Sequence, residues 1–149
     1  MEILPHFWIS DVNKNLDFLK NKKITLIIFL SKNNKFIKYY NDEQIRIPLD
    51  NLDNNDNKNN IVYQHLFDVV DCIHENINKN KNILLIGNEN DEQILDVFIL
   101  AYFIKYGKTN LEYAIYFLKS KKKFCLMPVF YYECCLLKYY KQIKALRNI

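Results

Sequence analysis

The chain has 149 residues, of which 50% are hydrophobic and 15% aromatic, which is enough for one compact domain with a substantial core. We therefore expect a single domain over residues 1–149. The longest apolar run, Val97 to Ile104, is far shorter than the ~20 residues that span a bilayer. The N-terminal residues have neither the length nor the flanks of a signal peptide, so we expect a soluble cytoplasmic protein, with a nuclear location as the alternative.

The cysteines and the charges exclude further classes of protein. Cys72, Cys125, Cys134 and Cys135 form no CxxC pair and have no spaced histidine partners, so they indicate neither a disulfide framework nor a zinc site, and no cofactor is expected. The formal net charge is +4, but residues 1–78 carry nine basic and eleven acidic side chains, whereas residues 79–149 carry twelve and six. The basic surface is therefore expected in the C-terminal half.

In the N-terminal half the pattern predicts strands around one short helix. Glu2–Asp11 is typical of an extended apolar segment, and its last residue is placed to cap a helix over Val12–Leu19. Ile24–Ser31 is apolar on both faces, which is typical of a central strand covered on two sides. Gln44–Leu49 predicts another short strand, and the low-complexity segment Asp50–Asn60 predicts a surface loop.

Helices dominate the C-terminal half. Apolar residues recur at helical spacing from Ile61 to about Asn78, which predicts an amphipathic helix. Asn82–Gly87 predicts a short buried strand, and Gln93–Tyr106 predicts a helix that is apolar nearly all round and therefore central to the fold. Gly107 follows this helix in the usual position of a C-terminal glycine.

Two more helices complete the predicted chain. The segment "TNLE" places Thr109 as a cap three residues before a glutamate, and the helix that it starts runs to about Lys119. A last helix is predicted over about Val129–Ala145. This order of strands and helices indicates an α/β domain built on a partly parallel sheet.

Four segments carry a resemblance that covers nearly the whole chain. In chain order they are "ILPHFWISD" (Ile3–Asp11), "ITLIIFLS" (Ile24–Ser31), "IPLDN" (Ile47–Asn51) and "LAYFIKYGKTNLEYAIYFLKSKKK" (Leu100–Lys123). Together they resemble the dual-specificity protein phosphatase family. The resemblance implies that family's fold, a cysteine-phosphatase fold with a central, mostly parallel sheet flanked by helices.

The resemblance also implies where an active site would lie. The family signature VHCxxGxxRS supplies a thiolate nucleophile, a nest of backbone N–H groups and an arginine that grips the phosphoryl oxygens. Laid on this chain, the cysteine position falls on Gly87 and the arginine position on Gln93, while the family's general acid falls on Asn51. We therefore expect a pseudoenzyme similar to the STYX-type pseudophosphatases, in which glycine also replaces the cysteine, although those keep the arginine. A residual phosphatase is the remote alternative.

The loop at the signature position is acidic. Glu89, Asp91 and Glu92 place three carboxylates where a phosphate dianion would sit, and each like-charge contact at 4 Å costs ~1 kcal/mol in water and several at an effective dielectric of 20. Phosphopeptide binding is therefore not expected in the old pocket. This acidic mouth fits a cationic protein partner, and drift after the loss of catalysis is the alternative interpretation.

The C-terminal half offers a second candidate surface, here called the basic face. Its members are Lys119, Lys121, Lys122, Lys123, Lys138, Lys141, Lys144 and Arg147. Tyrosines are interleaved with them, so one interpretation is binding of RNA or the ribosome through phosphates and stacking. An acidic protein partner and a solvated helix face with inward tyrosines are the others. The function expected overall is a protein-interaction scaffold, with a ribonucleoprotein- or ribosome-associated factor as the alternative.

Overall fold

The computed structural model describes residues 1–31, 35–49, 58–88, 91–122 and 131–147, apart from the side chain of Glu92. Five strands form one sheet in the order β1-β2-β5-β3-β4. They are β1 Glu2–Leu4, β2 Phe7–Ser10, β3 Ile24–Phe29, β4 Glu43–Arg46 and β5 Asn82–Ile86. Only the β1–β2 pair is antiparallel, so the prediction of a mostly parallel sheet is confirmed.

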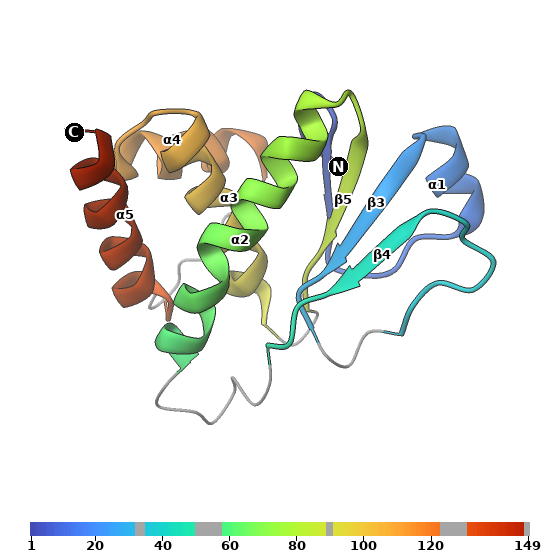
Figure 1. Ribbon diagram of the computed structural model, residues 1–149, viewed down its shortest axis with the longest axis horizontal. Helices are drawn as coiled ribbons and strands as arrows, with labels where there is room; N and C mark the ends of the chain where they lie inside the picture. Colours follow the sequence, from blue (N-terminus) through green and yellow to red (C-terminus); the bar gives the residue numbers. More distant parts are fainter. Residues whose placement is uncertain (32–34, 50–57, 89–90, 123–130, 148–149) are drawn as a thin grey trace.

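Helices cover both faces of this sheet unequally. They are α1 Leu16–Asn21, α2 Lys58–Asn78, α3 Glu92–Tyr106, α4 Leu111–Lys121 and α5 Glu133–Arg147. The short α1 lies on one side, and the other four gather on the opposite side (Figure 1). Among the described residues, none of these helices is long and apolar enough to cross a membrane.

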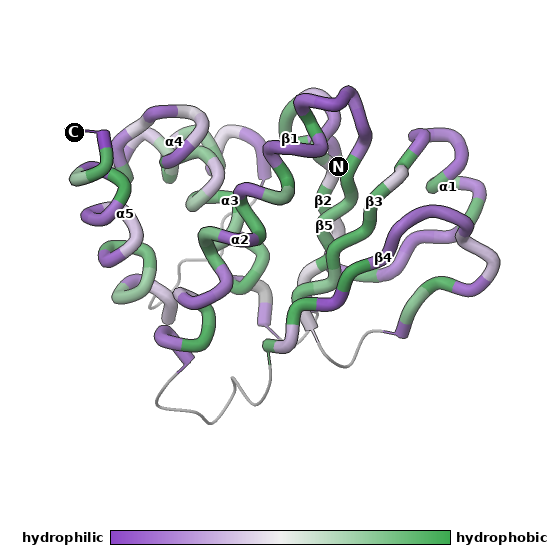
Figure 2. Tube along the Cα trace, viewed as in Figure 1, coloured by the Kyte–Doolittle hydropathy of each residue, from purple (hydrophilic) through white to green (hydrophobic). Residues whose placement is uncertain are grey.

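Two apolar cores lie on opposite sides of the sheet. Successive side chains of a strand point to opposite faces, so β3 and β5 contribute alternate residues to each core. Hydrophobic residues accordingly run along both strands, whereas α2 and α5 alternate in hydropathy (Figure 2). The main core takes Leu26, Ile28, Ile83 and Leu85, and the smaller core beneath α1 takes Ile27, Phe29, Leu84 and Ile86. The prediction that Ile24–Ser31 is covered on two sides is confirmed.

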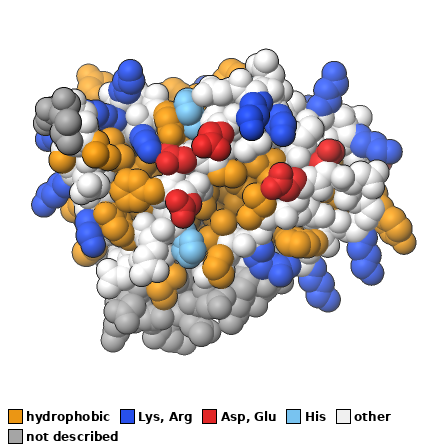
Figure 3. Space-filling model, viewed as in Figure 1, with side chains coloured by type: hydrophobic (Ala, Val, Ile, Leu, Met, Phe, Trp, Pro, Cys, Tyr) orange, Lys and Arg blue, Asp and Glu red, His pale blue; other side chains and the backbone are white. Residues whose placement is uncertain are grey.

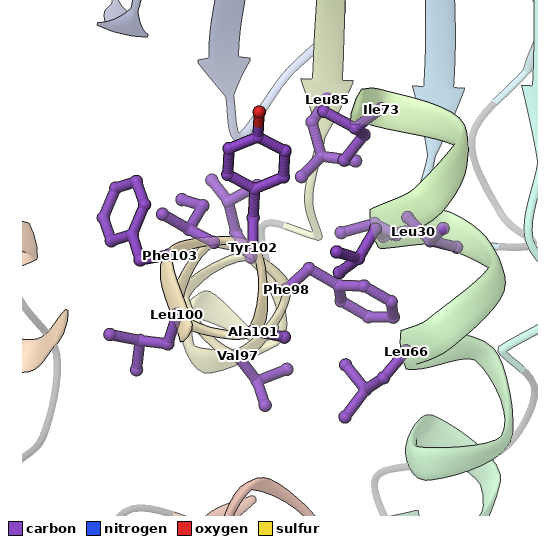
Figure 4. Close-up of a cluster of buried hydrophobic side chains, with 14 of the residues drawn as sticks. Leu30, Leu66, Ile73, Leu85, Val97, Phe98, Leu100, Ala101, Tyr102 and Phe103 are labelled. Atoms are coloured by element: carbon purple, nitrogen blue, oxygen red, sulfur yellow. The ribbon is translucent and has the colours of Figure 1, made fainter. Parts of the chain in front are cut away.

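Helix α3 is the centre of the main core. All of its residues from Ile94 to Ile104 are buried, as the apolar pattern predicts. Phe98 points toward Leu30 and Leu66 on the α2 side, whereas Phe103 points away from α2 (Figure 4). The helix therefore packs against neighbours all round, and only its two ends reach the surface of the domain.

The first helix begins later than predicted. Ser10 closes a turn in which its hydroxyl donates to the Val12 carbonyl (2.6 Å) and accepts the Val12 N–H (3.2 Å). Such local bonds compete with helix formation, so the residues after Asp11 stay outside a helix. Helix α1 instead begins at Leu16, capped by the Asn15 side chain, and the prediction that Asp11 caps a helix from Val12 is wrong.

The junction between α3 and α4 also differs from the prediction. Gly107 follows α3 but has φ −80°, and it is Lys108 that adopts a left-handed φ of 54°. A Cβ at Gly107 would lie 2.5 Å from the Phe103 carbonyl oxygen, which explains the glycine by close approach. The cap of α4 is Asn110, not Thr109, because the Asn110 side chain accepts the N–H at the third helical position (2.8 Å).

The remaining boundaries shift by a few residues. Helix α2 begins at Lys58, within the segment predicted as a loop, and residues 50–57 lie outside the described part of the chain. Strand β4 ends at Arg46, before the predicted Leu49. The predicted start of the last helix at Val129 lies outside the described residues, and α5 is observed from Glu133.

The start of α5 is held by a side chain from α2. Asn59 donates from Nδ2 to the Tyr131 carbonyl (3.0 Å) and accepts the Cys135 N–H at Oδ1 (3.0 Å). Cys135 lies in the first turn of α5, where backbone N–H groups have no partner within the helix. Asn59 therefore caps α5 from a distant element and fixes the two helices together at one end.

Candidate functional site

The signature position lies at the turn between the central strand β5 and α3. Gly87 directly follows β5, is buried, and donates its N–H to the Ser10 carbonyl (2.8 Å). A Cβ built at Gly87 would meet the Leu95 Cβ at 3.0 Å and the Asp11 Oδ1 at 3.6 Å. The position therefore has little room for a side chain, and any side chain there would have a carboxylate as neighbour.

The residue that the sequence alignment predicts at the arginine position is buried and neutral. Gln93 lies in the first turn of α3 and is 5% exposed. Its Oε1 accepts the backbone N–H of Tyr131 at 2.6 Å. The amide thus fixes the segment that leads into α5 to the start of α3.

Two carboxylates at the start of α3 bind side chains that flank α4 and α5. Asp91, the N-cap of α3, accepts a hydrogen bond from the Tyr132 hydroxyl at Oδ2. Asp96, one turn into the helix, accepts from the Lys122 ammonium at 2.8 Å, and the two side chains are 1% and 15% exposed. Polar groups at the start of α3 therefore hold the end of α4 and the start of α5 to the core.

The acidic mouth is described only in part. Asp91 is present in the bond to Tyr132, whereas Glu89 lies outside the described residues and the side chain of Glu92, the first residue of α3, is not described. Asn51, at the general-acid position, also lies outside them. The structure therefore places one of the three predicted carboxylates, and it adds Asp11, which the sequence indicated only as a helix cap.

The members of the basic face differ in their exposure and in their partners. Lys122 is taken up by the pair with Asp96, and the Arg147 guanidinium donates to the backbone carbonyls of Thr109 and Lys105 (3.5 Å each). The exposed members are Lys119, Lys121, Lys138, Lys141, Lys144 and Arg147, and Lys123 lies outside the described residues. On the face drawn in Figure 3, basic side chains lie mostly apart, around the edge of the molecule.

The tyrosines near the basic face have different environments. Tyr132 and Tyr139 are buried, Tyr140 is half-buried and Tyr131 is 51% exposed. The Lys58 ammonium lies 4.1 Å from the centre of the Tyr131 ring. Tyr132 and Tyr139 therefore fill the core beneath α5, whereas Tyr131 and Tyr140 are partly accessible and each has a lysine ammonium over its ring.

Two of the described cysteines, Cys72 and Cys135, have raised thiol pKa values. Burial, with the neighbouring Cys134 as a smaller cause, raises the pKa of Cys135 to about 12. Burial, with Glu43 and Glu75, also raises the pKa of Cys72. A thiol with a raised pKa is a poor nucleophile, because the thiolate is the reactive form. Among the described residues, no group of three His, Cys, Asp or Glu side chains could hold a metal ion.

The sequence carried a signal for Asp96 that the pattern analysis missed. It is the one charged residue within the otherwise apolar run Ile94–Ile104. A carboxylate in such a run is retained only with a partner, since an unpaired buried charge is costly. Its partner Lys122 could not be identified, because it lies 26 residues further along the chain.

Comparison with known proteins gives similarity in structure but not in sequence. No protein-family model and no curated protein matches the chain significantly. Human DUSP28 superposes with a TM-score of 0.77 at 15% identity, covering 97% of this chain and 98% of that one. A mouse putative dual specificity phosphatase complexed with zinc tungstate gives 0.78 at 16% identity, with 98% and 89% covered. Human tyrosine phosphatase-like serine/threonine/tyrosine-interacting protein gives 0.67 at 17%, with 99% and 97% covered.

These likenesses define the class of protein by its architecture. The chain is an α/β protein with the dual-specificity phosphatase fold over essentially its whole length, as the sequence resemblance implied. Within this fold, its own strand-to-helix turn carries Gly87 and the buried Gln93.

Proposed function

We propose that this chain is a catalytically inactive pseudophosphatase that acts as a protein-interaction module. The observation that carries the proposal is the pair at the signature positions, Gly87 and Gln93, with the Gln93 amide bound to the Tyr131 N–H (2.6 Å). Phosphoryl transfer in this fold needs a thiolate to attack phosphorus and a cation for the charge of the transition state. Glycine offers no attacking atom, and a neutral amide that faces the protein interior offers no cation.

The surroundings of the turn support the same conclusion. The Asp11 carboxylate lies 3.6 Å from where a Cβ at position 87 would be. Asp91 stands at the N-cap position of α3, with its carboxylate bound to the Tyr132 hydroxyl. A dianion approaching the turn would be repelled by both charges. The helix N-terminus, which attracts anions in active relatives of this fold, has an internal carboxylate beside it instead.

The catalytic half of the proposal is tested with the purified protein and an aryl phosphate. We expect the wild-type rate to equal the rate of Gly87→Ala, since neither has a nucleophile at that position. A Gln93→Ala variant serves as a second comparison. A wild-type rate that clearly exceeds both variants would overturn the proposal and return the chain to the phosphatases.

The binding half is tested by affinity purification of the tagged protein from its own cells, with and without RNase. We expect one set of protein partners that is recovered in both samples. Loss of the partners on RNase treatment would contradict this proposal and would assign the function to RNA contacts made by the basic face. The salt dependence of binding separates the two further, because contacts to phosphates weaken steeply as salt rises.

A further inference from the structure

A cavity lies at the far end of α3 from Gly87, about 22 Å along the helix. It holds about 560 Å³ and opens between the last turns of α3, the loop after it and α4. A volume of this size falls within the range of ligand pockets, which are mostly apolar with a few polar groups. Its lining is largely aromatic, with Tyr102, Phe103, Tyr106, Tyr113, Tyr116 and Phe117 contributing rings.

The inner wall of this cavity is rigidly held. The rings of Phe103 and Phe117 meet edge to face with centroids 4.9 Å apart. Tyr106 stacks on His74 at 3.6 Å and donates its hydroxyl to Asp71 (2.6 Å). Rings fixed in this way need no rearrangement before a ligand enters, which lowers the cost of binding.

The outer rim is exposed and carries a charge. Tyr113 and Tyr116 are 67% and 74% exposed, one turn apart on α4, and a second hollow of about 390 Å³ lies between them and Glu112. Both tyrosines also line the larger cavity, so the two hollows share these two rings. A carboxylate beside two tyrosine rings favours a cation, through the charge and through the negative faces of the rings.

Two basic side chains near the larger cavity, Lys105 and Arg147, are bound to other groups of the protein. The Lys105 ammonium is bound to Asp71 at 2.6 Å. Lys119 and Lys121 lie seven and nine residues further along α4, on the order of 10 Å or more from Glu112. The Arg147 guanidinium donates to the Thr109 and Lys105 carbonyls (3.5 Å each), and Lys108 lies in the loop before α4. Glu112 is the charged residue that lines the smaller hollow itself.

We propose that the two hollows together bind a short segment of a protein partner that carries a bulky apolar side chain next to a lysine or arginine. The apolar side chain fills the larger cavity, and the basic side chain lies between Glu112 and the rings of Tyr113 and Tyr116. Aromatic anchors in pockets with a charged rim are typical of binding hot spots. This inference rests on the proposed function, and it names the surface and the chemistry of the partner.

The direct test is an NMR titration of the tyrosine-labelled full chain with two tripeptides, acetyl-Trp-Ser-Arg-amide and acetyl-Trp-Ser-Glu-amide. We expect the arginine peptide to shift the Tyr113 and Tyr116 ring signals and to bind at least fivefold more tightly than the glutamate peptide. Glu112→Gln should abolish that preference and Tyr116→Ala should weaken both peptides. Glu133→Gln, a matched exposed glutamate in the first turn of α5, should keep the preference.

Three outcomes of this titration would overturn the inference. These are equal affinity for the two peptides, a preference that survives Glu112→Gln, and failure of both peptides to bind at millimolar concentration. Repeating the affinity purification with Glu112→Gln and Tyr116→Ala, and with Tyr39→Ala as an exposed-tyrosine control, separates the two proposals. Full retention of the partners by the first two variants would overturn this site and leave the protein-interaction proposal standing.

Discussion

The buried pair of Asp96 and Lys122 predicts a large and pH-dependent loss of stability when the lysine is removed. At 2.8 Å and an effective dielectric of 20 the gross attraction is ~6 kcal/mol, much of which offsets the desolvation of two buried charges. Lys122→Met leaves the carboxylate of Asp96, 1% exposed, without its cation. Breaking a buried pair from one side costs about 3–5 kcal/mol, so we expect a loss near the lower end of that range.

Urea unfolding followed by circular dichroism measures this loss. A fall of about 3 kcal/mol lowers the midpoint by roughly 1–2 M for a domain of this size. The matched control is Lys119→Met, an exposed lysine in the last turn of α4, for which a change within about 0.5 kcal/mol is expected. Asp96→Asn combined with Lys122→Met should recover at least half of the loss, because the buried charge is then gone.

The pH dependence gives a second, independent check. Removal of the Lys122 ammonium raises the folded-state pKa of Asp96 relative to wild type, because the attraction that favours its ionised form is lost. The deficit of Lys122→Met should therefore narrow as pH falls from about 7 to about 5. A deficit equal to that of Lys119→Met, or one that does not depend on pH, would refute the role assigned to the pair.

We expect the double variant Gly87→Cys with Gln93→Arg to give no measurable turnover of an aryl phosphate. The new thiol would lie beside the Asp11 carboxylate and against α3. Turnover above that of Gly87→Ala would show that the surrounding charge matters little. Burial opposes ionisation of Asp71, but hydrogen bonds from two neighbouring side chains lower its pKa below the ordinary value. The stabilisation by ionised Asp71 is therefore fully present above its unfolded-state pKa and is lost as pH falls through its lowered folded-state pKa. In thermal unfolding between about pH 6 and about pH 2, the melting temperature of Asp71→Asn should fall less than that of wild type. Because Asn110 caps α4, we expect Asn110→Ala to lower the free energy of unfolding by about 1 kcal/mol and Thr109→Ala to lower it by less. The reverse order in chemical denaturation would contradict the assignment of the cap.

The elements that could be predicted from the sequence are those with apolar residues on every face. Ile24–Ser31 and the apolar run of α3 have no polar face, so a central strand and a central helix were the consistent interpretations, and both are confirmed. Boundaries were less predictable because adjacent polar residues compete for the same role. Thr109 and Asn110 are both good caps, and the choice depends on which side chain reaches the N–H of the third helical position.

The location of the candidate site could be predicted from the sequence, but the bonding partners of its side chains could not. Gly87 and Gln93 were predicted at a strand-to-helix turn, and the structure has them directly after β5 and in the first turn of α3. Their alignment with the signature stays a prediction. The partner of Gln93 is the backbone of Tyr131, 38 residues away, and the partner of Asp96 is 26 residues away. Periodicity describes neighbours within one element, so it cannot report bonds between elements that the fold brings together.

The cap that Asn59 provides for α5 has a consequence for how the molecule becomes ordered. The two bonds made by Asn59 join residues 72 and 76 positions apart, among the longest separations between hydrogen-bonded residues of the described chain. Closing a long loop loses chain entropy before the contact contributes any favourable free energy, so such contacts form late. We expect the first turn of α5 to fold after the sheet and α3, and to protect its amides from hydrogen exchange least among the packed helices.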